Sequence, residues 1–487
     1  MNSARRQGAL RISAEWMRGL GAEGLCHFGN IQVRSSQLSA FFKIESKIMT
    51  RTATQRSLSV FPAGSNGEFN LPAEFATVIE RGEGCELWTV DGRRMLDFSM
   101  GWGSALVGHA RREVADAVAA QVRRGMNFAY VTDESLALAE EIVRLSPACE
   151  SVRFCASGTE ATMYCLRLAR ASTGRHKVLK FEGAYHGAND VGVCSLFPGT
   201  DTPPCQSTSS SAGVAPSTEL DTLVAPFNDL ETTREIVAQH AEELAAVIVE
   251  PFQRCVAPIP GFLASLREAT RGAGALLVFD EVVTGFRLAY GGAQEYYGVV
   301  PDLVAYGKAL GGGLPIGAFG GPREIMELVR EDRMGRDTYV WTASTLGGNP
   351  VSAAAANAAL QIFRQGPCYS RLHQLGSYLR SGVECVLADF GMDATVLGDG
   401  PLAQIAFTTA EVRDYRSSRH RDPRFARRLM LELFSRGIFL NPMGTKLYLS
   451  LAHDEATCDE FCSIFTAALG SVAEDSDLEL RGGSRRD

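Results

Sequence analysis

The sequence predicts an α/β fold built on a large, mostly parallel β-sheet. From about residue 75 onward, short apolar segments of strand length alternate with amphipathic segments of helix length, which is typical of a parallel sheet covered by helices. Strands of this sheet are predicted at residues 152–156, 177–181, 245–249 and 275–279. The core of the sheet is therefore expected between about residues 150 and 320.

The remaining elements follow from turn and helix signals. Residues 86–98 predict a hairpin that turns at Asp91-Gly92, a dipeptide that favours tight turns. Helices are predicted at about 111–123, 134–145 and 160–171, and an alanine-rich helix is predicted after Asn349-Pro350. Residues 200–218 are rich in serine, threonine and proline, so we expect a mobile loop, either a lid or a passive surface loop.

The composition indicates a globular protein that acts on small metabolites. The chain has 487 residues, of which 45% are hydrophobic, enough for one large core or two to three domains. Its net charge of −8 gives no electrostatic reason to expect nucleic acid or an anionic membrane as a partner. No apolar run is long enough to span a membrane. The 12 cysteines are scattered without Cys-x-x-Cys spacing, so we expect reduced thiols, a cytoplasmic location and no metal site.

The first fifty residues differ from the rest of the chain. They contain Arg5, Arg6, Arg11 and Arg18 with few acidic residues. Such a segment is typical of an organellar transit peptide. The alternative, which we favour, is a disordered tail or a wrongly assigned start of translation. Met49 begins a stretch that leads directly into the part of the chain with the predicted α/β pattern.

An aspartate and a lysine carry the strongest chemical signal. Asp280 ends the apolar strand 275–279, and Lys308 opens a glycine-rich loop shortly afterwards. Pyridoxal phosphate chemistry needs a carboxylate that keeps the pyridine nitrogen protonated and an amine that forms a Schiff base. The alternative for Asp280 is a salt bridge to an arginine such as Arg287.

Two further motifs favour the same chemistry. In the SGTEA motif, Ser157, Gly158 and Thr159 lie where a strand ends and a helix begins, and free N–H groups at such a place favour a phosphate. The alternative is an ordinary helix cap. Tyr185 and His186 offer flat side chains that could stack on a planar ring or simply pack in the core.

Ordered motifs that extend from about residue 60 to 460 identify a family. They include LDFSMGWG at 96–103, SGTEA at 157–161, YHG at 185–187, VEP at 249–251, DEVVTGFR at 280–287, GK at 307–308, GGGLPIG at 311–317 and TLGGNP at 345–350. The chain resembles the class III aminotransferases, which are pyridoxal phosphate enzymes of fold type I. It is most similar to their glutamate-1-semialdehyde 2,1-aminomutase branch.

The resemblance implies a domain organisation and an activity. A large domain at 111–345 binds pyridoxal phosphate, and a smaller α+β domain is formed by segments 56–110 and 346–470. Residues 1–55 form an extension, and residues 471–487 form a frayed tail. The implied activity is transfer of an amino group between an amino acid or amine and a keto or aldehyde acceptor.

The resemblance also implies roles at the cofactor. Lys308 forms the Schiff base and moves the proton, and Asp280 contacts the pyridinium. Val282 and Tyr185 lie on opposite faces of the ring. The phosphate is held by Gly158 and Thr159 beside Ser157, and by Thr345 of a neighbouring subunit, which implies a homodimer with shared sites. Glu250 belongs to a matching motif and is counted with the cofactor contacts, and Trp102 and His186 flank the pocket.

The substrate half of the motif set departs from the aminomutases. The arginine of their early segment is absent from residues 61–70, and residues 252–255 read FQRC. Their glutamate-bearing segment appears here as NPMGTK at 441–446. Arg254 and Lys446 are therefore candidate substrate contacts. We expect an aminotransferase; the alternatives are a glutamate-1-semialdehyde aminomutase and a non-catalytic binding protein, against which the presence of Lys308 argues.

Overall fold

The computed structural model describes residues 25–28, 31–34, 52–67, 71–336, 338–419, 422–440 and 444–482, and only the backbone at 25–28, 31–34 and 474–482. The chain divides into two compact units, Met1–Val78 and Ile79–Asp487. The first unit contains the antiparallel strands β1 (Leu25–Phe28) and β2 (Ile31–Arg34), helix α3 (Ala53–Val60) and the 3-10 helices η1 (Pro62–Gly64) and η2 (Ala73–Phe75). The hairpin of β1 and β2 is not predicted from the sequence. The rest of the predicted extension at 1–55, up to Arg51, lies outside the described residues.

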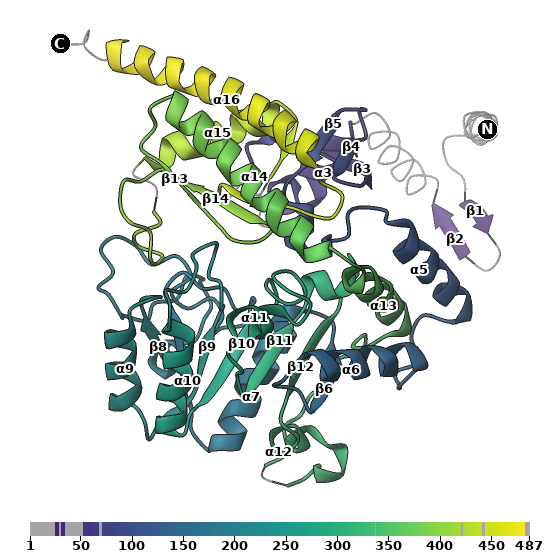
Figure 1. The fold of residues 1–487 in the computed structure, drawn as a ribbon. Helices are drawn as coiled ribbons and strands as arrows, with labels where there is room; N and C mark the ends of the chain where they lie inside the picture. Colours follow the sequence, from purple (N-terminus) through teal and green to yellow (C-terminus); the bar gives the residue numbers. More distant parts are fainter. Residues whose placement is uncertain are drawn as a thin grey trace. The chain divides into compact units, whose positions relative to one another are not determined.

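The second unit is organised around a seven-stranded sheet with the order β6-β12-β11-β10-β9-β7-β8 (Figure 1). Its strands are β6 (Ser151–Cys155), β7 (Lys177–Phe181), β8 (Thr222–Ala225), β9 (Leu244–Val249), β10 (Leu276–Glu281), β11 (Leu303–Tyr306) and β12 (Gly317–Gly321). Strands β8, β7, β9, β10 and β11 are parallel, whereas β12 runs antiparallel to both of its neighbours. The predicted mostly parallel α/β sheet is confirmed.

The second unit also contains two smaller sheets and many helices. The smaller sheets have the orders β15-β5-β4-β3 and β13-β14-β16. Their strands are β3 (Ile79–Glu83), β4 (Glu86–Thr89), β5 (Arg94–Asp97), β13 (Thr395–Leu397), β14 (Leu402–Ala406), β15 (Ile438–Phe439) and β16 (Lys446–Tyr448). The α-helices are α4 (Met100–Gly103), α5 (Arg112–Arg124), α6 (Asp133–Leu145), α7 (Gly158–Thr173), α8 (Pro216–Asp221), α9 (Leu230–Gln239), α10 (Phe262–Ala273), α11 (Gly292–Tyr297), α12 (Arg323–Met326), α13 (Pro350–Arg364), α14 (Cys368–Asp389), α15 (Pro423–Ser435) and α16 (Glu455–Gly482). The 3-10 helices are η3 (Lys308–Gly311), η4 (Glu327–Val329) and η5 (Glu331–Arg333).

Both faces of the large sheet are buried, because apolar side chains alternate along its strands. In β10, Val278 packs in one cluster with Leu168 of α7, while Leu277 and Phe279 pack in another with Leu266 of α10. Side chains that alternate in this way point to opposite faces of a sheet. Helices therefore cover the sheet on both sides, and the end of β10 is enclosed between them.

Most predicted elements are confirmed with small shifts in their ends. The hairpin of β4 and β5 has its turn at Asp91-Gly92, and α5, α6, α7 and α13 lie where helices are predicted. Strands β3, β8 and β11–β16 are additional. The 200–218 segment is tied to the chain before it by hydrogen bonds from Ser195 N to Thr208 O and from Ser210 N to Val193 O, so it is not a free loop.

The structure bears on the predictions about the cysteines and about membrane-spanning segments. The cysteines that the structure describes are free thiols, and most of them are buried, as predicted. Within the described part of the chain, no helix combines the length and hydropathy that a bilayer crossing requires.

Candidate active site

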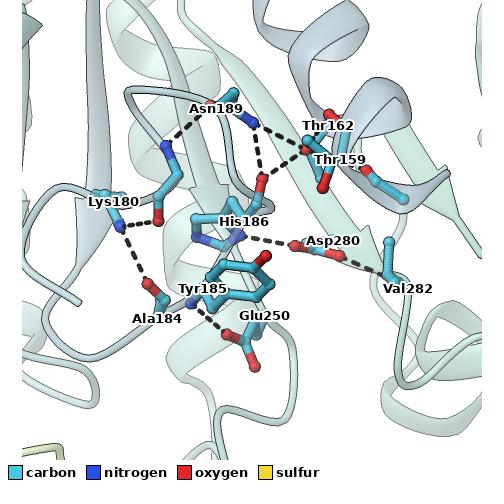
Figure 2. A network of polar contacts seen from close by, with 12 residues as sticks. Thr159, Thr162, Lys180, Ala184, Tyr185, His186, Asn189, Glu250, Asp280 and Val282 are labelled. Carbon is cyan, nitrogen blue, oxygen red and sulfur yellow. Dashed lines mark hydrogen bonds and ion pairs between the residues drawn. The ribbon is translucent and has the colours of Figure 1, made fainter. Parts of the chain in front are cut away.

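Asp280 lies at the carboxyl end of β10 and is held in place by two hydrogen bonds. Its side chain is 5% exposed. Oδ2 lies 2.8 Å from Nδ1 of His186, and Oδ1 accepts a hydrogen bond from the Val282 backbone N–H at 3.1 Å (Figure 2). A buried carboxylate requires such partners, because desolvation disfavours its charged form. The acid is therefore fixed at the edge of a parallel sheet where ligands of α/β proteins commonly bind.

The alternative salt bridge from Asp280 to Arg287 is not formed. The guanidinium of Arg287 is fully buried and donates to the backbone carbonyls of Val283, Gly103 and Leu449. Burial lowers the pKa of Arg287 to about 10. The partner of Asp280 is instead a histidine, which the sequence places 94 positions earlier.

The loop after β7 carries Tyr185 and His186 to the end of β10. His186 is fully buried, and among the described residues its Nε2 has no hydrogen-bond partner. Its Nδ1 contacts Asp280. The backbone N–H of Tyr185 donates to Oε1 of Glu250 at 2.8 Å, so the acid of the VEP motif supports the Tyr185 loop (Figure 2).

Lys180 fixes the base of this loop and was missed by sequence analysis. Its fully buried ammonium donates to the carbonyls of Ala184 at 3.0 Å, Gly192 at 3.0 Å and Cys194 at 2.5 Å. Burial lowers the pKa of Lys180 to about 7. The one signal in the sequence was a lysine inside a predicted core strand, where a cation needs several acceptors.

The SGTEA motif begins helix α7, where it caps the helix and leaves two N–H groups free. The Ser157 hydroxyl accepts a hydrogen bond from Glu160 N at 3.2 Å, so the helix-cap interpretation is confirmed. The N–H groups of Gly158 and Thr159 donate to no group among the described residues. Free N–H groups in the first turn of a helix favour an anion such as a phosphate. Thr159 Oγ1 accepts from Ala188 N at 3.2 Å, which joins this turn to the Tyr185 loop.

Gly158, Val282 and Gly307 make a close contact between α7, β10 and η3. A Cβ atom on Gly158 would lie 2.8 Å from both methyl carbons of Val282. A Cβ atom on Gly307 would lie 3.4 Å from Val282 Cγ1 and 3.5 Å from the Cα of Gly158. Packing against Val282 therefore leaves no room for a side chain at Gly158, and Gly307, which precedes Lys308, lies in ordinary contact with the first turn of α7.

Lys308 begins η3 with a φ of 43°, a conformation that a residue with a side chain rarely adopts. Its side chain is partly buried. Burial lowers the pKa of the Lys308 amine, and the positive charge of Lys446 lowers it further. The carboxylates of Asp280 and Glu250 act in the opposite direction without reversing the effect of burial.

The remaining candidates lie around this group. Helix α4, which contains Trp102, contacts both η3 and β16, the strand that begins with Lys446. The guanidinium of Arg254 lies 5.8 Å from the ring centroid of Tyr185. Thr345 is exposed, and its backbone carbonyl accepts a hydrogen bond from Asn127.

The arrangement suits a ligand with a basic ring nitrogen at one end and a phosphate at the other. Asp280 can pair with a protonated ring nitrogen, and the free N–H groups of Gly158 and Thr159 can bind the phosphate. Lys308, whose amine has a lowered pKa, follows Gly307, and Gly307 lies against Val282 and Gly158. Such an amine is more often neutral at physiological pH, so it is a better nucleophile and proton carrier.

Comparison with known proteins gives consistent matches. Residues 70–469 match the family model described as Aminotransferase class-III. A glutamate-1-semialdehyde 2,1-aminomutase from Thermomicrobium roseum is 42% identical over 420 residues, which cover 85% of this chain and 96% of that protein. The crystal structure of an omega-transaminase from Sphaerobacter thermophilus has 36% identity and a TM-score of 0.80, and the match covers 86% of this chain and 97% of that one. A transaminase with PLP bound has 29% identity and a TM-score of 0.78, with 87% and 97% covered.

Proposed function

We propose that this chain, which belongs to the class III aminotransferase family, is a pyridoxal phosphate enzyme that uses Lys308 to move an amino group from an amine or amino acid to a keto or aldehyde acceptor. The observation that carries the proposal is the convergence of the Lys308 amine, the fixed carboxylate of Asp280 and the free N–H groups of Gly158 and Thr159.

The side chains divide the work as follows. When bound, pyridoxal phosphate supplies an electron sink for the carbon next to the substrate nitrogen. Asp280 keeps the ring nitrogen protonated, and His186 keeps the Asp280 carboxylate oriented through the contact at Oδ2. Lys308 binds the cofactor. Its amine then carries the proton that is removed from the substrate carbon next to nitrogen and delivers it to the cofactor carbon on the other side of that nitrogen. Val282 and Tyr185 enclose the ring.

Transfer between two molecules is favoured over transfer within one. The aminomutases carry an arginine in an early segment for which residues 61–70 of this chain offer none. Loss of an arginine that pairs with a carboxylate usually costs much of the binding. The alternative is a glutamate-1-semialdehyde aminomutase. It is supported by the similarity to the relative of that name, which is 42% identical.

We predict that holoenzyme converts keto or aldehyde acceptors in the presence of an amino donor faster than it isomerises glutamate-1-semialdehyde. The measurement compares product formation with a panel of donors and acceptors against formation of 5-aminolevulinate from glutamate-1-semialdehyde alone. Efficient formation of 5-aminolevulinate without any donor or acceptor would overturn the prediction and favour the aminomutase function instead. Absence of both reactions would instead count against the enzyme proposal.

We also propose that the enzyme is a homodimer with shared sites. A surface that we call the Tyr130 patch has its large apolar side chains exposed on two neighbouring segments; these are Met126, Phe128, Tyr130, Val131, Trp341 and Leu346. The hydrogen bond from Asn127 to the Thr345 carbonyl joins the two segments. Large contiguous apolar patches on soluble proteins often mark interfaces. Thr345 within this patch could then meet the phosphate bound by the second subunit.

The dimer proposal predicts that Tyr130→Asp with Val131→Asp yields a monomer with weakened cofactor binding. Both side chains are largely exposed, at 84% and 70%, so the substitutions leave the fold of one chain intact. Leu220→Asp is the matched control. Leu220 is similarly exposed, at 75%, but it lies outside the Tyr130 patch, in α8, which precedes the edge strand β8 of the large sheet. Sedimentation velocity of the holo and apo forms checks both results. A wild-type monomer with full cofactor occupancy would contradict the proposal.

A further inference from the structure

We propose that Lys446 binds the carboxylate of the substrate, so that the enzyme prefers amino and keto acids over simple amines and ketones. The inference rests on the proposed function, because it assumes that amino groups are exchanged at Lys308. It concerns the half of the site in which the motifs depart from the aminomutases.

Lys446 is a buried cation without an anionic partner. The residue is 9% exposed, and its Nζ lies 5.1 Å from the ring centroid of Tyr448. Among the residues that the structure describes, Nζ forms no hydrogen bond and no ion pair. An ammonium has three donors, and those of Lys446 are not used by any described residue, so a ligand that accepts hydrogen bonds here is favoured.

The side chain stays charged despite its burial. Burial lowers the pKa of Lys446, but the negative charges that Tyr448, Cys255 and Glu250 can carry outweigh burial and the nearby Arg254, so the pKa ends above its ordinary value. The ring of Tyr448 is itself fixed by close packing. The guanidinium of Arg287 lies 5.5 Å from the ring centroid, and a Cβ atom on Gly103 would lie 2.6 Å from the ring carbon Cε1. The ammonium is therefore a positioned positive charge.

This charge lies in the same region as the reacting amine. Strand β16 begins with Lys446 and contacts α4, and α4 also contacts η3, which begins with Lys308. A carboxylate at Lys446 would pair with its positive charge and would leave the substrate nitrogen near Lys308.

The other cations near the site already have acceptors. Arg254 Nε donates to the carbonyl of Gly183 at 3.1 Å, and its guanidinium covers Tyr185. Arg416 forms two hydrogen bonds, of 2.6 and 2.7 Å, with the buried carboxylate of Glu182. The structure thus separates the two candidates from the sequence: Arg254 supports the cofactor-binding loop, and Lys446 is available.

The test is binding of carboxylates that carry no amine. We expect acetate, propionate or 3-phenylpropanoate to bind wild-type holoenzyme in isothermal titration calorimetry. In Lys446→Met, which keeps the length and apolar stem of the side chain, we expect the Kd to rise about 10-fold to 100-fold, as for loss of a hydrogen bond to a charged group. Lys446→Arg should restore most of the affinity. Lys177→Met is the control, because Lys177 forms an ion pair with Glu243 at the start of β7 and should leave the Kd unchanged.

Turnover provides a second readout. Alanine and 2-aminopropane differ only in that a methyl group replaces the carboxylate, so the ratio of their kcat/KM values measures carboxylate recognition. We expect Lys446→Met to lower this ratio by about 10-fold or more through KM, with a smaller change in kcat. An unchanged ratio and an unchanged Kd in a folded variant would overturn the inference, as would failure of all three carboxylates to bind the wild type. Failure of the proposed function would look different, because wild-type protein would then transfer no amino group from any donor.

Discussion

Replacement of Lys308 by alanine should lower turnover by a factor of about 10⁴ or more, because the same amine is the nucleophile and the proton carrier. It should also abolish covalent attachment of the cofactor. In wild-type protein, borohydride reduction should leave pyridoxal phosphate on the peptide that contains Lys308, as detected by mass spectrometry. In Lys308→Ala no peptide should carry it, although the free N–H groups of Gly158 and Thr159 should still bind phosphate.

The control for this prediction is a lysine outside the site. Lys177 lies at the start of β7 and forms a 2.9 Å ion pair with Glu243, so Lys177→Ala should keep both turnover and the modified peptide. Undiminished turnover in a folded Lys308→Ala variant would exclude Lys308 as the catalytic residue. Modification of Lys180 or Lys446 in place of Lys308 would also contradict the assignment.

Asp280→Asn should reduce turnover by about 10²-fold to 10³-fold while largely preserving the fold, since asparagine has the same shape without the charge. Without the carboxylate, the ring nitrogen is not kept protonated and electrons are withdrawn less strongly from the substrate carbon. The measurement is kcat at saturating cofactor, together with the cofactor Kd, so that weaker binding and slower chemistry are separated.

His186 allows a comparison with this variant. His186→Gln retains the Asp280 charge and removes only the side chain that contacts its Oδ2, so its effect on kcat should be smaller than that of Asp280→Asn. If Asp280→Asn retains full kcat at saturating cofactor, the proposed pairing with the ring nitrogen is wrong.

Sequence analysis was strongest where one residue type and its local setting determine the outcome. Asp280 and the strand before it form a pattern that needs no knowledge of distant contacts, as does the helix start at Ser157. The strands β11 and β12 were missed because the sequences LVAY and GAFGG are too short and too rich in small residues to show a period.

The pairing of charged side chains could not be predicted from the sequence. Whether Asp280 meets Arg287 or His186 depends on which loops the fold brings to the end of β10. In the same way, Arg254 and Lys446 were equivalent candidates until their surroundings were known. A partner that is distant in the sequence carries no local signal, since loops place it through tertiary packing.

Lys446 belongs to a different sheet from the residues of the cofactor site. It begins β16 of the β13-β14-β16 sheet, whereas Asp280 ends a strand of the seven-stranded sheet and Lys308 follows one. If Lys446 binds the substrate carboxylate as proposed, substitutions at this position should alter which molecules are accepted while leaving the hydrogen bonds of Asp280 in place. For enzyme engineering, this separation makes residues 444–448 a better starting point for new specificities than the Tyr185 loop, in which any change also affects Asp280 through His186. It also offers a route by which related enzymes could diverge in substrate while retaining one chemistry.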